Sequence, residues 1–291
     1  MFDSRPAVLV TGASKGIGEA CTLRLARDGF RVYAGVRRDA DGMALIRQAG
    51  DAVTPVLLDV TDAAQIAEAA EQIDSECGER GLQALVNNAG VAVAGPLEFL
   101  PIAELRQQLE INVTGQVAVT QACLPLLRRA RASSKGDHRA GRIVFMSSVA
   151  GRSSLPFMGP YAASKFALEA VADALRIELK PFGLAVSLVE PGVIATPIWE
   201  TSRDRAERNI AEMPPQLDEF YGRAMDALRS RIDSMGGLPA ERVADVVAHA
   251  LTAKRPRIRY LVGRDARLRV AMQMLPDRLH DALIAAAVKR M

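Results

Sequence analysis

The chain has 291 residues, of which 49% are hydrophobic and 24% are charged, and its mean hydropathy is +0.07. This composition is that of an ordinary globular protein and excludes a disordered or collagen-like chain. The net charge of +3 conceals a basic tail, because residues 254–291 carry +7 and the remainder carries −4. The length would allow two domains, but α/β folds often form one domain of this size.

Cysteine usage and the N-terminus bear on the compartment. Cys21, Cys77 and Cys123 form no CxxC pair, and an odd, scattered set does not suit a disulfide framework. The first six residues include an acid and a base and lead into the apolar run Ala7–Val10, which is too short for the core of a signal peptide. No stretch reaches the about 18 apolar residues of a membrane span. We expect a cytoplasmic protein with no integral membrane segment and no metal site.

The basic tail has two interpretations. Positive charge favours nucleic acid or an anionic membrane surface, but the tail shows neither interleaved aromatic residues nor a nucleic-acid-binding motif, so we expect no nucleic-acid partner. Leu279, Leu283 and Ile284 lie near Lys289 and Arg290. A weak peripheral contact with a membrane therefore stays open, beside the alternative of a cap packed on the protein or at a subunit contact.

Short apolar runs rich in β-branched residues alternate with longer segments of helical period along the chain. This alternation predicts repeated βαβ units and a parallel sheet whose strands are buried on both faces. We expect one doubly wound α/β domain over residues 1–291 with about seven strands. The predicted strands are Ala7–Val10, Arg31–Val36, Val53–Leu58, Ala84–Asn87, Arg142–Ser147, Leu184–Val189 and Arg259–Val262.

The helices between these strands are predicted to begin near Gly16, Ala63, Ile102, Pro160 and Pro239. Pro239 suits a first-turn position, where its missing N–H is not needed. Residues 131–141 are polar and contain glycine, which is typical of a surface loop, and His138 within them is expected to face solvent. Residues 197–237 mix apolar and charged residues without a clear strand and predict an amphipathic helical flap over the substrate. A basic extension follows from about residue 264.

The first predicted strand leads into Thr11-Gly12-Ala13-Ser14-Lys15-Gly16-Ile17-Gly18. Glycines at this spacing allow a tight turn, a close approach of the backbone to a pyrophosphate, and a helix N-terminus directed at the anion. Any connection from strand to helix can use glycine for a positive φ, so the turn alone decides little. Its place between a strand and a helix favours a dinucleotide site.

The residues after the second strand bear on the choice of dinucleotide. A carboxylate there would accept a hydrogen bond from the ribose 2′-hydroxyl of NAD, but the strand is followed by Arg37 and Arg38. Arg37 and Lys15 would bind a 2′-phosphate, so NADP(H) is predicted. The alternative is that they are ordinary surface cations, and Asp39 and Asp41 nearby keep NAD(H) open.

Two polar residues stand where neighbouring strands are predicted to end. Asp59 follows the third strand and Asn88 the fourth. Ligands of doubly wound folds bind outside the carboxyl ends of the strands, so both side chains are candidate cofactor contacts. Taken singly, Asp59 could instead be the N-cap of a helix beginning near Thr61, and Asn88 a turn residue.

Tyr161 and Lys165 are four residues apart, so on a helix their side chains lie on one face, one turn apart. A phenol has a pKa of about 10, and an ammonium at about 4 Å in an effective dielectric of about 20 would lower it toward 7. Ser147 and Ser148 end the fifth predicted strand, where neighbouring side chains point to opposite faces. We expect Ser148 to bind the substrate oxygen while Tyr161 transfers the proton.

In combination these residues resemble the short-chain dehydrogenase/reductase family over essentially the whole chain. The matching motifs are the TGxxxGxG turn at Thr11–Gly18, NNAG at Asn87–Gly90, Asn112, Ser148, Tyr161 with Lys165, and Pro191-Gly192. The resemblance implies a Rossmann fold and an NAD(P)-dependent oxidoreductase acting on CH–OH groups. Its implied catalytic residues are Asn112, Ser148, Tyr161 and Lys165, with Asn112 holding a water in a proton relay to the lysine.

The cofactor contacts implied by the resemblance, together with Arg37 from the charge argument, run through most of the chain. They are Gly12, Ser14, Lys15, Gly16, Ile17, Gly18, Arg37, Asp59, Val60, Asn88, Ala89, Gly90, Tyr161, Lys165, Pro191, Gly192, Ile194 and Thr196.

The segments around residues 154–169 and 257–260 resemble the hydroxysteroid and retinol dehydrogenase branch, which implies a bulky, lipophilic alcohol or ketone as substrate. The expected pocket walls are Leu155, Phe157, Met158, Trp199 and Met213, although such side chains also serve as ordinary core. The family further implies a homodimer or homotetramer built on the helices within 102–130 and 160–180. The alternatives are an NAD-linked alcohol dehydrogenase of the same family and a non-catalytic dinucleotide-sensing or scaffold protein.

Overall fold

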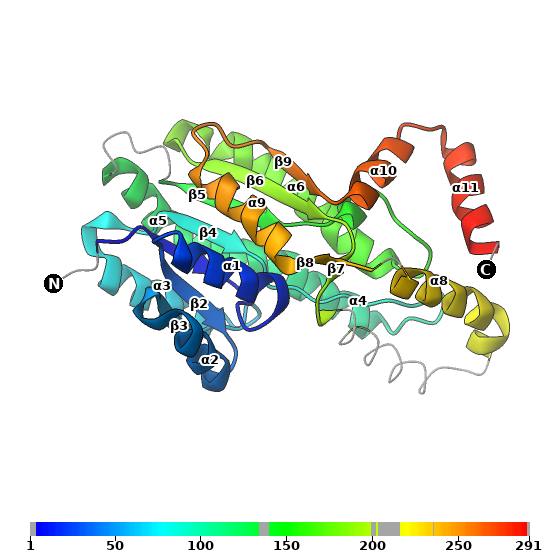
Figure 1. Ribbon diagram of the computed structural model, residues 1–291, viewed down its shortest axis with the longest axis horizontal. Helices are drawn as coiled ribbons and strands as arrows, with labels where there is room; N and C mark the ends of the chain where they lie inside the picture. The colour runs from blue at the N-terminus through cyan, green and yellow to red at the C-terminus, as the bar shows by residue number, and fades with distance from the viewer. Residues whose placement is uncertain (1–3, 134–139, 199–201, 203–215, 235, 290–291) are drawn as a thin grey trace.

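A computed structural model describes residues 4–133, 140–198, 202, 216–234 and 236–289 of the chain. His138, Trp199 and Met213, which the sequence analysis singled out, lie outside the described residues. In Figure 1 a twisted sheet occupies one part of the molecule, and a group of helices extends beyond the end of its strands.

Seven parallel strands form the central sheet in the order β3-β2-β1-β4-β5-β6-β9. The chain builds one half outward from β1 to β3, then returns to the other side of β1 and builds the second half. This confirms the predicted doubly wound sheet, and it places the switch point between β1 and β4. The strands are β1 (Ala7–Val10), β2 (Arg31–Val36), β3 (Val53–Leu57), β4 (Ala84–Asn87), β5 (Arg142–Met146), β6 (Ala185–Pro191) and β9 (Arg259–Val262).

Helices cover both faces of this sheet, with α1, α2 and α9 on one face and α3, α5 and α6 on the other (Figure 1). No helix in the described part of the chain is long and apolar enough to cross a membrane. The helix bounds are α1 (Gly16–Arg27), α2 (Asp39–Ala49), α3 (Ala63–Cys77), α4 (Ile102–Leu109), α5 (Gly115–Ser133), α6 (Gly159–Glu178), α8 (Arg223–Ser234), α9 (Ala240–Thr252), α10 (Arg264–Met272) and α11 (Asp277–Lys289).

Successive side chains along a strand pack into two separate hydrophobic cores, one on each face of the sheet. In β1, Val8 and Val10 pack into the core shared with α1 and α9, whereas Ala7 and Leu9 pack into the core shared with α3, α5 and α6. All four side chains are buried. Burial on both faces explains why the strands are continuously apolar, and it leaves the strand ends as the place for polar chemistry.

The predicted strands match the observed ones to within two residues, but a small second sheet was missed. It pairs β7 (Ile194–Ala195) with β8 (Leu238–Pro239). Strands of two residues are too short to show a period in the sequence. This pair joins the chain after β6 to the start of α9.

One helix was missed, and two predictions about helix ends were wrong in detail. Helix α2 was missed because Gly42 interrupts its pattern; a Cβ there would lie 2.5 Å from the Cβ of Pro55 in β3, so the helix uses glycine for close packing. Helix α5 continues to Ser133, into the segment predicted as a loop. Pro239 is the N-cap of α9 rather than a first-turn residue, since it is extended (φ −64°, ψ 145°) and pairs with Ala195.

The N-cap of α3 is Asp62, not Asp59. Asp62 is extended, and its carboxylate accepts hydrogen bonds from the backbone N–H groups of Ala64 (2.9 Å) and Gln65 (3.2 Å). The Asp59 carboxylate instead accepts from the backbone N–H (2.9 Å) and the hydroxyl (2.7 Å) of Thr61. The capping alternative for Asp59 is therefore excluded.

We expect Asp62→Ala to lower the free energy of unfolding by about 1 kcal/mol, because it leaves orphan N–H groups at the start of α3. Asp62→Asn should retain most of the stability, since its side-chain oxygen still accepts a bond. Chemical denaturation measures both. Equal losses for the two variants would show that the carboxylate charge, and not the cap, is what stabilises α3.

Candidate active site

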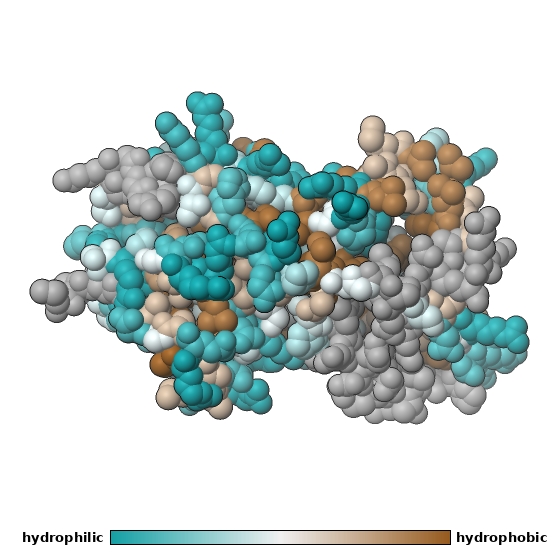
Figure 2. Space-filling model, in the orientation of Figure 1, coloured by the Kyte–Doolittle hydropathy of each residue, from teal (hydrophilic) through white to brown (hydrophobic). Residues whose placement is uncertain are grey.

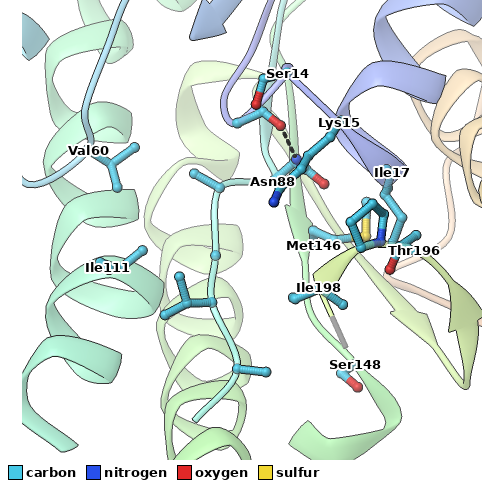
Figure 3. A pocket seen from close by; sticks show the side chains of 18 of the residues that line it. Ser14, Lys15, Ile17, Val60, Asn88, Ile111, Met146, Ser148, Thr196 and Ile198 are labelled. Atoms are coloured by element: carbon cyan, nitrogen blue, oxygen red, sulfur yellow. Dashed lines mark hydrogen bonds between the residues drawn. The ribbon is translucent and has the colours of Figure 1, made fainter. Parts of the chain in front are cut away.

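One cleft at the carboxyl ends of the strands gathers the residues that were predicted to bind the dinucleotide. Every member of that set lines it, together with Ser148. Figure 3 shows Ser14, Lys15 and Asn88 on one side of the cleft and Ser148 and Ile198 farther along it. The lining residues not foreseen are Gly35, Val36, Leu58, Val91, Ala92, Ile111, Met146, Ser147, Pro197, Ile198 and Ser202.

The glycine turn has the close approaches that a dinucleotide cradle requires. Gly12 and Gly16 adopt positive φ values of 63° and 60°. A Cβ on Gly18 would collide with the carbonyl of Gly12 and would lie 2.6 Å from Nδ2 of Asn88. Only glycine fits these positions without strain. The first turn of α1 therefore lies directly against the turn, and its N-terminus faces the cleft.

Asn88 stabilises this cradle from β4. Its Nδ2 donates to the carbonyls of Thr11 (2.9 Å) and Gly12 (3.2 Å). The backbone N–H groups of Asn88 and Ala89 both donate to the hydroxyl of Thr11, at 2.9 and 3.0 Å. Asn88 therefore fixes the cradle through its side chain as well as lining the cleft.

The two arginines after β2 differ in their surroundings. Arg37 is exposed and lines the cleft, whereas Arg38 forms a two-bond ion pair with Asp41 at 2.9 and 3.0 Å. Asp59 is the one carboxylate among the described residues that line the cleft. The glycine cradle and the helix N-terminus thus fit the pyrophosphate of a dinucleotide, and Lys15 and Arg37 add positive charge to the same cleft.

Tyr161 and Lys165 lie on the first turns of α6, as their spacing predicted. Both side chains are buried, and Nζ of Lys165 lies 5.7 Å from the centre of the Tyr161 ring. The ammonium donates to the carbonyl of Met146, the last residue of β5, at 2.7 Å. Ser148 begins the next turn, and its hydroxyl accepts from the N–H of Ala150 at 3.1 Å.

The sequence predicts that Lys165 alone lowers the pKa of Tyr161, but the structure shows other influences on both side chains. Burial raises the pKa of Tyr161, while a hydrogen bond with Ser148 and the charge of Arg269 act in the opposite direction. Burial also lowers the pKa of Lys165 to about 8, and only the carboxylate of Glu169 opposes that change. Desolvation explains the difference, because it disfavours the charged form of both groups.

Asn112 lies behind the cleft and does not line it. It sits in a π-helical turn, Glu110–Thr114, between α4 and α5. Its amide group donates to the carbonyl of Val91 (2.9 Å) and to the hydroxyl of Ser164 (3.1 Å), and its oxygen accepts from the N–H of Val91 (2.9 Å). The side chain thus holds the strand β4 extension against α6, and its part in a proton relay stays a prediction.

Ser147 lines the same cleft but is placed differently from Ser148. Its hydroxyl is buried and has no hydrogen-bond partner among the described residues. A Cβ added to Gly151 would lie 2.9 Å from that oxygen, so the turn after Ser148 folds back onto it. Ser148 also lines the cleft, and it lowers the pKa of Tyr161, so its role as the substrate-facing hydroxyl stays the prediction.

A buried charge network that the sequence did not reveal lies behind Lys165. Glu169, one helical turn beyond the lysine, and Glu190, at the end of β6, are both buried. Nε of Arg259 lies 2.9 Å from Glu169 and 3.2 Å from Glu190, and Arg152 pairs with Glu190 at 3.2 Å. Burial and the neighbouring Glu169 raise the pKa of Glu190. Two buried carboxylates are held near the lysine by two arginines.

The expected pocket walls are only partly accounted for. Met158 and Leu155 pack with Tyr161 in a small apolar cluster, and none of Leu155, Phe157 and Met158 lines the cleft itself. Phe157 has a positive φ of 64°, uncommon for a residue with a side chain, and its ring meets that of Tyr221 edge-on at 5.9 Å. These side chains therefore border the reacting end of the cleft.

A family model described as short chain dehydrogenase matches residues 6–207. The chain belongs to this family. It is 37% identical over 286 residues to the NADPH-dependent 3-dehydrocapnine reductase of Ornithobacterium rhinotracheale, covering 97% of each chain. It is 36% identical over 294 residues to retinol dehydrogenase 5 of Mus musculus, covering 97% of this chain and 89% of the relative.

A solved short chain dehydrogenase from Burkholderia cenocepacia J2315, in complex with NADP, has the same fold, with a TM-score of 0.70, 27% identity and 99% of both chains covered. The family resemblance is thus confirmed, and the chain is an NAD(P)-dependent oxidoreductase of the short-chain dehydrogenase family that acts on CH–OH groups.

We expect Lys165→Met to abolish turnover and to stabilise the protein at pH 7. Burial lowers the lysine pKa from its ordinary 10.5 to about 8, so holding the ammonium in the folded state costs about 3 kcal/mol. The lost hydrogen bond to Met146 offsets about 1 kcal/mol of the gain.

The stability that Lys165→Met gains over the wild type should shrink between about pH 8 and pH 10.5. In that interval the unfolded chain binds a proton at Lys165 that the folded wild type has released, so wild-type stability rises relative to the variant. Thermal unfolding at pH 7 and pH 10 measures the difference. A variant that is less stable than wild type at pH 7 would contradict the desolvation of Lys165.

Proposed function

We propose that this protein transfers hydride between NADP(H) and a bulky, lipophilic secondary alcohol or ketone. The cofactor assignment rests on the positive charge in the cleft, which Lys15 and Arg37 both line. Among the described residues just after β2, no carboxylate lines the cleft. The relative from O. rhinotracheale is named as NADPH-dependent, which supports the same choice.

The proton chemistry falls to residues of this chain. When bound, the nicotinamide supplies or accepts the hydride. Tyr161 donates the proton to the substrate oxygen during reduction and accepts it during oxidation. Ser148 hydrogen-bonds the same oxygen, and the Lys165 ammonium stabilises the phenolate that reduction leaves behind.

The proposed substrate class rests on the apolar border of the reacting end. Met158, Leu155 and Ala150 pack with Tyr161 in one apolar cluster behind the cleft. Ala92, Ile194 and Ile198 line the cleft itself, so much of its surface there favours an apolar group. Relatives are named as a retinol dehydrogenase and a 3-dehydrocapnine reductase, which supports a lipophilic alcohol or ketone. An NAD-linked alcohol dehydrogenase and a non-catalytic dinucleotide sensor are the alternatives that the experiments below separate.

The assembly and location are also proposals. We propose a homodimer or homotetramer in the cytoplasm, with the basic tail as a weak contact to a membrane surface or as a cap. Figure 2 shows apolar surface over the corner formed by α10 and α11, where Leu268, Met274, Leu279 and Leu283 are exposed. Exposed apolar groups beside basic ones suit either a lipid surface or a subunit contact.

Arg37→Gln is expected to weaken NADPH binding at least tenfold and to leave NADH binding unchanged, because only NADPH carries the phosphate that the arginine would bind. Arg38→Gln is the matched control, since Arg38 pairs with Asp41 instead of lining the cleft. Nicotinamide fluorescence titrations give both affinities. Tighter binding of NADH than of NADPH by the wild type would overturn the cofactor assignment, and binding of neither would favour the scaffold alternative.

Tyr161→Phe should reduce ketone turnover by about 10²- to 10⁴-fold while the affinity for NADPH stays the same, because the change removes only the proton donor. NADPH oxidation is measured with a ketosteroid, retinal and simple aliphatic ketones. The bulky compounds should give the higher kcat/KM. Retained activity in the variant would defeat the role of Tyr161, and a preference for the small ketones would defeat the substrate class.

A further inference from the structure

Helix α10 contacts the Pro191-Gly192 wall of the cleft and the turn that follows Ser148. At its start, the carboxylate of Asp265 accepts a hydrogen bond from the N–H of Val193 at 2.8 Å. A Cβ on Gly192 would collide with that carboxylate, so the helix lies flush against the Pro191-Gly192 wall. Four residues later, on the same face of the helix, Nη2 of Arg269 donates to the carbonyl of Ser153 at 2.6 Å.

The bond from Arg269 reaches the turn that carries the substrate-facing hydroxyl. Ser153 is buried, and its N–H donates to the carbonyl of Val149 at 3.0 Å. Val149 is the first residue of the short helical turn for which Ser148 is the N-cap. The Arg269 guanidinium therefore holds Ser153, at the end of the turn that begins at Ser148.

We propose that Arg269 is a positioning residue of the catalytic centre, which fixes the Ser148–Ser153 turn and supplies a positive charge within electrostatic reach of Tyr161. This proposal rests on the function proposed for Tyr161. Arg269 lies on α10, outside residues 6–207, which are the part of the chain that the family model matches.

The charge of Arg269 is poorly neutralised. Among the described residues, its buried Nε has no hydrogen-bond partner and no carboxylate forms an ion pair with it. Asp265 acts on it only through its charge from the same helix. An arginine keeps its proton in such a place, so the site holds a lasting positive charge.

Three groups from the surrounding elements bear on Tyr161. Lys165 on its own helix lies near the ring, and the Ser148 hydroxyl on the turn and Arg269 on α10 both lower the pKa of the phenol. Burial raises the pKa of Tyr161, and the charge of Arg269 lowers it. Removing that charge should therefore raise the pKa of the tyrosine further.

The test measures Tyr161 ionisation without a substrate. Stopped-flow pH jumps follow tyrosinate absorbance before alkaline unfolding, and each protein is compared with its own Tyr161→Phe counterpart, so the difference belongs to Tyr161. Arg269→Gln should shift the midpoint upward by about one to two pH units, as expected for one charge roughly 6–12 Å away in an effective dielectric of about 20. Arg269→Lys keeps the charge and should restore most of the shift.

Two further variants keep the outcome decisive. Arg267→Gln, on an exposed position of the same helix, should leave the midpoint unchanged. Arg269→Met also removes the charge and keeps an apolar side chain of similar length, so it tests the charge where Arg269→Gln does not fold. An unchanged midpoint in Arg269→Gln or in Arg269→Met would overturn the proposal, even if turnover fell.

The proposed function can fail separately from this role of Arg269. Activity that survives Tyr161→Phe would defeat the function proposed for the tyrosine. An inactive Tyr161→Phe protein combined with an unmoved tyrosine midpoint in Arg269→Gln would defeat only the role of Arg269. In ketone reduction, the high-pH loss of activity should follow the same upward shift in Arg269→Gln, because Tyr161 must be protonated to donate.

Discussion

The hydrogen bond from the Lys165 ammonium to the carbonyl of Met146 joins helix α6 to the end of strand β5. Tyr161 lies one helical turn before the lysine and Ser148 lies two residues after Met146, so this bond brings the acid and the substrate-facing hydroxyl together. A buried ammonium without such a partner would cost several kcal/mol. The carbonyl at the strand end is therefore what allows a charge to remain in an otherwise apolar part of the cleft.

Side chains of alternating charge extend from Lys165 away from the cleft. Glu169 lies one turn beyond the lysine and meets Arg259, and Arg259 also contacts Glu190 at the end of β6. Glu190 immediately precedes the Pro191-Gly192 wall of the cleft. The network thus ties α6, β6 and β9 into one support behind the catalytic residues. Breaking one partner would leave a buried charge unpaired, whose penalty exceeds the net value of an intact pair.

The parts of this site that could be predicted from the sequence are those set by local structure. The glycine turn, the strand ends at Asp59 and Asn88, and the spacing of Tyr161 and Lys165 each depend on a few consecutive residues. The partners of Asn112 could not be predicted, because Val91 and Ser164 meet it only after folding. The pKa of Lys165 was equally inaccessible, since desolvation depends on how many elements cover the side chain.

The part of the cleft predicted to bind the cofactor and the part around Tyr161 differ in how far they depend on local structure. The cofactor part is built from successive strand-to-helix turns, each formed by neighbouring residues, so short motifs in the sequence reveal it. The part around Tyr161 depends on α10, which reaches back from beyond residue 207 to contact Gly192, Val193 and Ser153. Changes in that helix would alter the surroundings of Tyr161 without changing any motif of the family. Proteins with the same catalytic residues can therefore differ in the ionisation of the tyrosine.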